Sequence, residues 1–572
     1  MKNGGKKLIR NGGSVGLRTV DIGTTMKKTK LKFLKPLSGV FLVLITVFII
    51  YIYLNFEREL RRLKEVQVVP SFDNYLKTRS GRTASQQQHR QQGFRGEKIV
   101  HLDLKGAPPK VEYLRKILPL FAKMGATGIL MEYEDMFPYD GDISALNHYS
   151  VQNISEMNAL ADEHHLQIIP LVQTFGHMEF ILKLEKYRDL REETWYPQTI
   201  CPSNFQSLDL IQSMIGQVLR AHPKAKAIHI GCDEVFHVGS CNRCYDRMLK
   251  HGWSKVRLFL DHIVTVAKHI KQTYPGVKVL IWDDLLRNIE QPDLKESGIA
   301  DYVTPVVWKY VPDIYTTLTH KVLYKYSNVF QSVWIASAFK GATGSNQYIT
   351  DASYHVDNHA SWMNVVRDYS MTIHFEGIFI TGWQRYDHFA VLCELLPVAI
   401  PSLAMCFRQL AGNNDPPTDP PIDVGNLLNC DKPYGLLGPN YGNPKCSYPG
   451  AEILDEVYRL KQLKDKYAQL LADSRIKGWM NEFNVRHSFS NPELVESGTA
   501  DLDWFKGQLW SVETNLWTSM ADIYDNYTIS EWMESYIRPF EAEIVSLWEK
   551  KEKLLNVDVW PRRPINFNIT KP

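Results

Sequence analysis

Residues 227–234 read AIHIGCDE, an apolar run that ends in the two adjacent carboxylates Asp233 and Glu234. The run is too short for a helix and is rich in isoleucine, so residues 227–233 predict a buried β-strand. Seven similar runs precede or follow it, at residues 99–105, 128–133, 167–173, 278–283, 302–308, 332–338 and 377–383. The chain therefore has eight predicted strands.

Longer amphipathic stretches lie between these runs. In residues 256–274, apolar residues such as Phe259, Ile263 and Ile270 recur at helical spacing. Eight strands that alternate with helices predict a (β/α)8 TIM barrel of α/β class, over residues 98–410. An open doubly wound sheet is the alternative. Residues 105–109 (KGAPP) do not form the Gly-rich loop that follows the first strand of that class.

A second apolar segment, residues 37–54 (LSGVFLVLITVFIIYIYL), contains eighteen residues without a charge. This length spans most of a hydrocarbon core of about 30 Å, so we expect a transmembrane signal-anchor. A cleaved signal peptide would have a shorter apolar region followed by small residues, whereas Asn55-Phe56-Glu57-Arg58 follows here. A buried core helix is the other alternative.

The charges around this segment predict its orientation. Residues 1–64 carry fourteen Lys and Arg against three acids, which leaves the remaining 508 residues with a net charge of −8 (+3 minus +11). The basic tail, residues 1–36, is expected to stay cytoplasmic and the folded part to be lumenal or extracellular, as in a single-pass type II protein of the Golgi or secretory pathway. Sequons at Asn153, Asn526 and Asn568 agree with a glycoprotein. A mildly acidic folded part makes nucleic acid an unsuitable partner.

The regions on either side of the barrel are simpler. Residues 55–97 are polar and Gln-rich and predict a stem. Residues 411–572 begin with a Pro/Gly-rich loop, in which Cys430 and Cys446 are a plausible disulfide pair, and continue as helices over residues 451–474, 502–524 and 530–553. Cys241 and Cys244 have the spacing of half a zinc site, but no second Cys or His pair accompanies them, so a loop bridge or free thiols are favoured.

Functional side chains of such barrels gather at the C-terminal ends of the strands. Here these ends combine carboxylates with aromatic rings, which suits a sugar site because rings stack on the apolar faces of sugars and carboxylates bind hydroxyls. The candidates for substrate binding are Lys105, His177, His229, Trp282, Asp283, Trp308, Tyr310, Trp383 and Asp387. Trp334 lies within a strand, where core packing is an equal alternative.

The strongest single signal is the Asp233–Glu234 pair, which we call the carboxylate pair. Neighbouring acids raise one another's pKa, so one of them can stay protonated as a general acid while the other is ionised. A solvated charged turn is the alternative for an isolated Asp-Glu dipeptide. Its place at the end of a predicted strand, beside other polar strand ends, favours catalysis.

The stretch His229-Ile-Gly-Cys-Asp-Glu234 resembles the His-x-Gly-Gly-Asp-Glu motif of family-20 glycoside hydrolases, the β-N-acetylhexosaminidases, with Cys232 in place of the second glycine. The segments HLDLKGAPP, QTFGHMEF and TGWQRYDH, at the first, third and eighth strands, extend the likeness over residues 98–405. The resemblance implies hydrolysis of terminal non-reducing N-acetyl-D-hexosamine from glycoconjugates. It also implies a retaining mechanism in which the substrate's acetamido oxygen is the nucleophile.

The resemblance also implies roles for individual residues. Glu234 would be the general acid and base, and Asp233 would orient the acetamido group and stabilise its positive charge. Trp282, Trp308 and Trp383 would form the acetamide pocket and His177 would support the acid. Lys105 and Asp387 stand where the family often has an Arg and another acid for hydroxyl recognition. The resemblance favours N-acetylgalactosamine over N-acetylglucosamine. We expect no cofactor and no metal.

Two other functions fit parts of the sequence. Asp140-Gly-Asp142 resembles the Asp-x-Asp of metal-dependent enzymes, and an anchor with a stem is the plan of a type II Golgi glycosyltransferase. Such a transferase would need a nucleotide-sugar domain rather than eight regular repeats. A catalytically inactive membrane-tethered sugar-binding protein is the second alternative, which the intact carboxylate pair disfavours. A homodimer is an alternative to the monomer.

Overall fold

The computed structural model describes residues 93–412, 423–434 and 444–565. The predicted tail and anchor, nearly all of the stem and the Asn568 sequon lie outside these residues. Within them, none of the helices combines the length and the apolar character that a membrane span requires.

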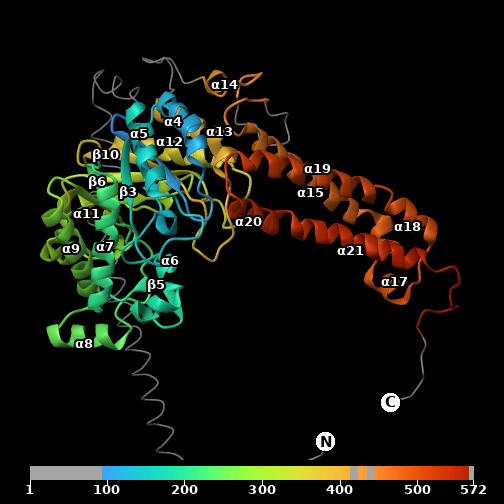
Figure 1. Cartoon of the computed structure of the whole chain (residues 1–572), viewed down its shortest axis with the longest axis horizontal. Helices are drawn as coiled ribbons and strands as arrows, with labels where there is room; N and C mark the ends of the chain where they lie inside the picture. The colour runs from blue at the N-terminus through green and yellow to red at the C-terminus, as the bar shows by residue number, and fades with distance from the viewer. Residues whose placement is uncertain (1–92, 413–422, 435–443, 566–572) are drawn as a thin grey trace, which may run out of the picture. The chain divides into compact units, whose positions relative to one another are not determined.

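Eight parallel strands close into a barrel (Figure 1), which confirms the predicted fold and excludes the open sheet. The strands are β1 (Glu97–Asp103), β2 (Gly128–Glu132), β3 (Gln167–Leu171), β6 (Ala227–His229), β7 (Lys278–Trp282), β8 (Val303–Trp308), β9 (Val333–Lys340) and β10 (Phe375–Gly382). The barrel closes because β1 pairs with β2 on one side and with β10 on the other. Seven strands match their predicted positions to within two residues at each end. The exception is β6, which ends at His229 because the backbone turns at Gly231 and Cys232.

A helix follows each strand of the barrel along the chain and buries one face against it. These helices are α4 (Val111–Met124), α5 (Val151–Glu163), α7 (Phe205–Ala221), α9 (Lys255–Thr273), α10 (Gln291–Ser297), α11 (His320–Val329), α12 (Ala352–Tyr369) and α13 (Leu396–Leu410). In α4, the buried residues Leu114, Ile117 and Phe121 form one stripe, and the helix ends at Gly125, which has φ 96°. Helix α13 is apolar on nearly all sides because it packs against α12, α15 and β9.

The N-terminal end of the barrel is filled by apolar side chains, including Ile99, Leu130 and Trp334. Trp334 stacks on Phe379 at 4.7 Å and donates a hydrogen bond from Nε1 to Glu376 Oε2 at 3.0 Å. Because Glu376 lies at the start of β10, Trp334 belongs to the core at the end opposite to the predicted site.

Two long loops carry structure that the sequence pattern did not predict. The loop after β3 contains α6 (Glu179–Leu182) and an antiparallel hairpin of β4 (Arg191–Glu193) and β5 (Tyr196–Ile200). The loop after β6 contains α8 (Asn242–His251). Short 3-10 turns occupy Glu134–Met136, Glu185–Leu190, Leu286–Asn288, Ile299–Asp301 and Ile314–Thr316.

The C-terminal region is helical, as predicted. Its helices are α14 (Val424–Leu427), α15 (Ala451–Ala472), α16 (Ser474–Trp479), α17 (Glu482–His487), α18 (Pro492–Gly498), α19 (Leu502–Ala521), α20 (Asn526–Tyr536) and α21 (Arg538–Leu555). Figure 1 shows the long helices α15, α19 and α21 side by side, in orange and red. The helix predicted over residues 530–553 is divided between α20 and α21, with a proline in the first turn of α21. Thr528 on α20 donates a hydrogen bond to the Gly106 carbonyl at 2.9 Å, so this region contacts the loop after β1.

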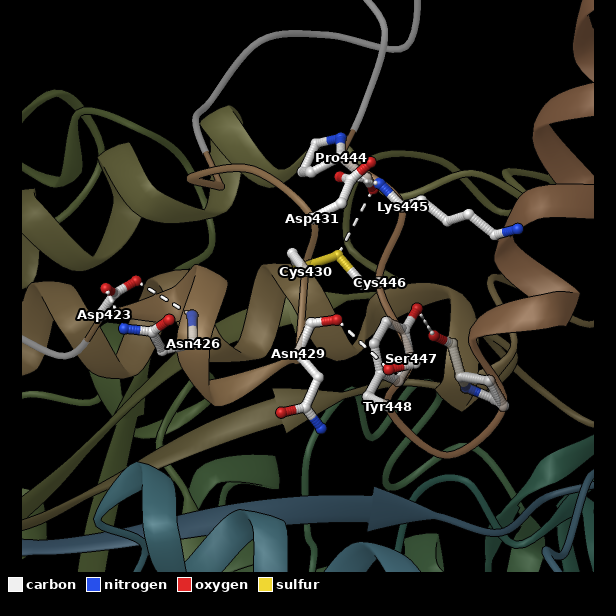
Figure 2. The surroundings of a disulfide bond; sticks show 11 residues. Asp423, Asn426, Asn429, Cys430, Asp431, Pro444, Lys445, Cys446, Ser447 and Tyr448 are labelled. Carbon is white, nitrogen blue, oxygen red and sulfur yellow. Dashed lines mark hydrogen bonds between the residues drawn. A yellow bond between two sulfur atoms is a disulfide. The ribbon is translucent and has the colours of Figure 1, made fainter.

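A disulfide joins Cys430 and Cys446, which confirms the predicted pair. Figure 2 shows it between two chain segments that also hydrogen-bond to each other. The Asp431 N–H donates to the Lys445 carbonyl at 2.9 Å, and the Lys445 N–H donates to Asp431 Oδ1 at 2.8 Å. The bond therefore fixes the ends of the loop that follows α14.

Candidate active site

A sharp backbone turn at the end of β6 presents the carboxylate pair. Gly231, Cys232 and Glu234 have φ values of 66°, 71° and 45°, all in the left-handed region. A Cβ on Gly231 would lie 1.8 Å from Gln173 Oε1, so only glycine fits there. Cys232 occupies a left-handed conformation that favours glycine. Strained backbone of this kind is typical of functional sites.

The turn places the two carboxylates in different surroundings. The Asp233 side chain is 9% exposed and the Glu234 side chain is 45% exposed. His177, in the loop after β3, lies against both of them. Its Nε2 is 3.6 Å from Asp233 Oδ2 and 3.3 Å from Glu234 Oε2, and its Nδ1 is 4.0 Å from Glu179 Oε1. The structure thus brings together the three residues that were predicted to act at the reacting centre.

Burial and neighbouring charges shift the pKa values of Asp233, Glu234 and His177 in different ways. Burial raises the pKa of Asp233 to about 7, although His177 opposes the shift. The hydrogen bond from His177 lowers the pKa of Glu234. Burial alone would lower the pKa of His177, but Asp233, Glu234 and Glu179 raise it to about 10. At neutral pH the free site therefore holds a protonated His177 and an ionised Glu234. One carboxylate has a raised pKa, as expected, but it is Asp233 rather than the proposed acid.

The loop after β7 supports the pair through Asp284. The Glu234 N–H donates to Asp284 Oδ2 at 2.9 Å, and Trp308 Nε1 donates to Asp284 Oδ1 at 3.4 Å. Asp283, which was the predicted ligand, is instead enclosed: Arg287 donates to both of its carboxylate oxygens, and Tyr326 and the Trp308 N–H donate as well. All of its acceptor capacity is used, so Asp283 positions the loop and is not a sugar ligand.

Lys105 is also placed differently from the prediction. It is buried, with Nζ 3.2 Å from Asp103 Oδ2, 3.1 Å from Glu132 Oε1 and 3.4 Å from Glu134 Oε1. Burial would lower the pKa of Lys105, but these three carboxylates raise it well above its ordinary value. The ammonium also lies 5.4 Å from the Trp383 ring centroid. Lys105 therefore holds an acidic cluster together beneath Trp383 and has no freedom to grip hydroxyls.

Aromatic rings lie at the ends of β7, β8 and β10, at the same end of the barrel as the carboxylate pair. Trp282 lies 5.8 Å from Trp383 between ring centroids, and Trp308 stacks on Tyr310 at 5.2 Å. Tyr310 in turn lies 6.5 Å from Trp383. Trp308, Tyr310 and Trp383 are half-buried, so their remaining faces are available to a ligand.

Two further predicted residues have defined positions. The His229 ring lies 4.2 Å from Trp282, and its Nδ1 accepts the Gly231 N–H at 3.0 Å, so His229 supports the turn. Asp387, in the loop after β10, is half-buried, and its Oδ1 accepts the N–H groups of Phe389 and Ala390. Burial raises the pKa of Glu179, and the charge of Asp387 adds a smaller shift in the same direction.

Several buried polar atoms of this site have no hydrogen-bond partner in the described part of the chain. They include Asp233 Oδ1, Gln173 Oε1, His229 Nε2, Trp282 Nε1, Glu179 Oε2, Tyr310 Oη and Trp383 Nε1. Buried polar atoms normally have partners, and each exception requires an explanation. Acceptors and donors that converge at the ends of β3, β6 and β7 fit a polar ligand bound at the barrel mouth.

A second support comes from the C-terminal helices, for which the sequence predicted no role in the site. Arg385, in the loop after β10, donates to both carboxylate oxygens of Glu531 on α20, at 2.7 and 2.8 Å. The same guanidinium covers Gly106, where an added Cβ would lie 1.9 Å from Nη2. The loops after β1 and β10 are thus held by a residue from outside the barrel.

The Asp-x-Asp segment lies apart from this arrangement. Asp140 is exposed, and the side chain of Asp142 is 70% exposed and pairs with Lys186 at 2.8 Å. Nothing in its surroundings favours a nucleotide-sugar site.

Comparison with known proteins gives the same family as the sequence motif. A family model described as the catalytic domain of glycosyl hydrolase family 20 matches residues 113–331. Hexosaminidase D of Homo sapiens is 38% identical over 478 residues, which cover 82% of this chain and 96% of that protein. Hexosaminidase D of Bos taurus is 47% identical over 317 residues, which cover 55% of this chain and 91% of that protein.

Among solved structures, a β-N-acetylhexosaminidase from Bacteroides fragilis is 14% identical with a TM-score of 0.44, covering 58% of this chain and 70% of that one. The extensive similarity to the human relative and the match to the family model confirm the resemblance seen in the sequence. The chain belongs to glycosyl hydrolase family 20 and is a glycoside hydrolase.

Proposed function

We propose that the chain is a β-N-acetylhexosaminidase that removes terminal N-acetylhexosamine by a retaining, substrate-assisted mechanism and prefers N-acetylgalactosamine. The family and the names of the two hexosaminidase D relatives support the reaction class. The observation that carries the mechanism is the unequal exposure of the carboxylate pair. Asp233 is buried with one oxygen unpartnered, and Glu234 is exposed enough to meet a leaving group.

Each carboxylate has a separate task in this mechanism. Asp233 Oδ1 accepts the acetamido N–H, which turns the acetamido oxygen toward the anomeric carbon. That oxygen forms a bond to the anomeric carbon while the glycosidic bond breaks, and the leaving oxygen takes a proton from Glu234. The ionised Asp233 stabilises the resulting oxazolinium. Glu234 then removes a proton from water, whose oxygen attacks the same carbon while the bond from that carbon to the acetamido oxygen breaks. The sugar is released with its acetamido group restored and its configuration retained.

The proton on Glu234 depends on the substrate, because His177 lowers the pKa of this residue in the free site. We propose that the leaving group displaces water from the exposed Glu234 and so raises its pKa. His177, which also lies 3.6 Å from Asp233, then stabilises the ionised form of that buried carboxylate. Trp282, Trp308 and Trp383 enclose the acetamido group, and Asp387 is the remaining candidate for the ring hydroxyls.

The experiment compares hydrolysis of 4-nitrophenyl β-GalNAc and β-GlcNAc by the full chain and by Glu234→Gln. We expect a higher kcat/KM for the GalNAc substrate and a loss of about 10²–10⁴-fold in Glu234→Gln with sugar binding retained. Glu185→Gln, whose side chain is 87% exposed, is the matched control. Sugar binding without turnover would favour the inactive sugar-binding protein. Turnover that requires a sugar nucleotide and a metal would favour the transferase.

We further propose that residues 37–54 anchor the enzyme in the membrane as a type II protein, with the barrel in the lumen of the secretory pathway. The apolar segment and the basic residues before it support this topology. In sealed microsomes, protease should remove the tail and leave the barrel intact. Digestion of the barrel before the membrane is opened would contradict the proposal. Light scattering of the purified chain distinguishes a monomer from the proposed alternative, a homodimer.

A further inference from the structure

Three cysteines and a glutamate meet beside the loop that carries the carboxylate pair. Cys201 follows β5, Cys241 and Cys244 begin α8, and Glu192 lies on β4. One sulfur or oxygen atom from each of the four lies within 4.8 Å of the others. Cys201, Cys244 and Glu192 are buried and Cys241 is half-buried. Such a set has the donor types of a tetrahedral metal site.

The distances between the sulfurs fit a shared ion better than a disulfide. Cys201 Sγ lies 3.4 Å from Cys241 Sγ and 3.7 Å from Cys244 Sγ. A disulfide requires about 2.0 Å. Two thiolates on one tetrahedral Zn²⁺, each about 2.3 Å from the ion, lie about 3.8 Å apart. Three cysteines also cannot all pair among themselves.

Glu192 is oriented as a fourth ligand. Its Oε1 accepts the backbone N–H groups of Ser240 and Cys241 at 2.7 and 3.1 Å, which fixes the carboxylate. Its Oε2 points at the sulfurs, 3.1 Å from Cys244 Sγ. A carboxylate that is 2% exposed is costly to bury without a cation, and a metal ion would supply that charge.

The surroundings complete the site. Leu258, Val238 and Trp253 pack around the cysteines. The Cys244 N–H donates to Cys241 Sγ at 3.4 Å, so the turn at the start of α8 favours a thiolate. The Arg243 guanidinium lies beside Cys201 and balances part of the negative charge.

We propose that Cys201, Cys241, Cys244 and Glu192 bind one Zn²⁺ as a structural site, with release of the thiol protons. This differs from the expectation of no metal, which rested on the lack of a second Cys or His pair near Cys241. The fold brings in Cys201 from 40 residues away and Glu192 from 49. Thiolate ligands select zinc over the hard cations that prefer oxygen.

The ion would join the two loops that build the catalytic centre. The β4–β5 hairpin belongs to the loop that carries His177, and Cys241 belongs to the loop that carries Glu234. These loops already touch where Thr199 Oγ1 donates to the Phe236 carbonyl at 2.8 Å. Zinc would thus fix the hairpin against the loop after β6 without touching the substrate.

The test measures metal content in the full chain, purified without chelators. We expect one zinc ion per chain by elemental mass spectrometry in the wild type and in Cys393→Ser, a buried cysteine outside the cluster. We expect none in Cys201→Ser or in the double variant Cys241→Ser/Cys244→Ser. Because these variants can also fail to fold, the wild type loaded with Co²⁺ provides a second readout, a thiolate-to-cobalt charge-transfer absorption.

Three results would overturn the proposal. The first is a wild type without stoichiometric metal and without the cobalt absorption. The second is zinc that stays bound in the cysteine variants. The third is a disulfide within the cluster, which denatured, unreduced protein would reveal by alkylation of only one of its three thiols. None of these readouts depends on glycosidase activity, so they are independent of the proposed function.

Discussion

Asp233→Asn should stabilise the protein at alkaline pH while it abolishes activity. Burial raises the pKa of Asp233 from 3.8 to about 7. The folded state therefore holds the proton more tightly than the unfolded state does. Stability is lost as pH rises from about 4 to about 7, because the unfolded chain binds fewer protons in this window. Each unit of difference between the folded and unfolded pKa corresponds to about 1.4 kcal/mol. The ionised Asp233 therefore lowers the free energy of unfolding by on the order of 4 kcal/mol at pH 8. Asparagine removes that cost.

The assay is urea unfolding of wild type and Asp233→Asn at pH 5 and pH 8. At pH 5 only part of the cost is present, so the advantage of the variant should grow by roughly 3 kcal/mol between the two pH values. Asp209→Asn, an exposed aspartate on α7, is the matched control and should show no such growth. An advantage that is equal at both pH values, or a wild type that is more stable at pH 8, would refute the assigned environment of Asp233.

Three further predictions concern the supports of the site. His177→Asn removes the cation that lowers the pKa values of the carboxylate pair, so both limbs of the pH profile of kcat/KM should move to higher pH. A pH profile that does not move would contradict this role of His177. Glu531→Ala leaves the buried guanidinium of Arg385 without its hydrogen-bond acceptor, so the unfolding free energy in urea should fall by about 1–3 kcal/mol and kcat/KM should also fall. The exposed neighbour variant Glu534→Ala should have neither effect. Removing the Cys430–Cys446 disulfide, which closes a loop across 16 positions, should lower the unfolding free energy by about 2–3 kcal/mol and leave kcat unchanged; a large loss of kcat would contradict this separation.

The barrel could be predicted because each strand is a short apolar run with a helix after it. Prediction from runs of apolar residues failed for segments in which the local sequence pattern is weak. The hairpin strands β4 (REE) and β5 (YPQTI) carry no alternation of apolar and polar residues, and they form because the long loop after β3 folds on itself. Strand β6 is shorter than its apolar run because Gly231 and Cys232 turn the backbone, which composition does not reveal.

The site was predictable as a set of strand ends but not in its details. Asp283 and Asp284 are adjacent and alike in sequence, yet one is enclosed by Arg287 and the other supports Glu234. The role of the Lys105 side chain depends on the three carboxylates around it, and only the fold brings these carboxylates together. The roles given to the other substrate-binding residues remain predictions.

Contacts between distant residues were the least accessible to sequence reasoning. Glu531 lies 146 residues from Arg385, and the cysteine cluster joins three separate segments of the chain. Neither has a local signature beyond the spacing of Cys241 and Cys244. Such contacts can be recognised only when the three-dimensional positions of the barrel loops are known.

In the proposed mechanism, the substrate's own acetamido group is the nucleophile and Asp233 holds it. The most direct measurement compares kcat/KM for 4-nitrophenyl β-glycosides whose 2-acetamido group carries zero, one, two or three fluorine atoms. Because fluorine withdraws electrons from the attacking oxygen, kcat/KM should fall steeply and progressively as the number of fluorine atoms increases. A rate that does not change across the series, or equal hydrolysis of the β-galactoside that lacks the acetamido group, would contradict this mechanism.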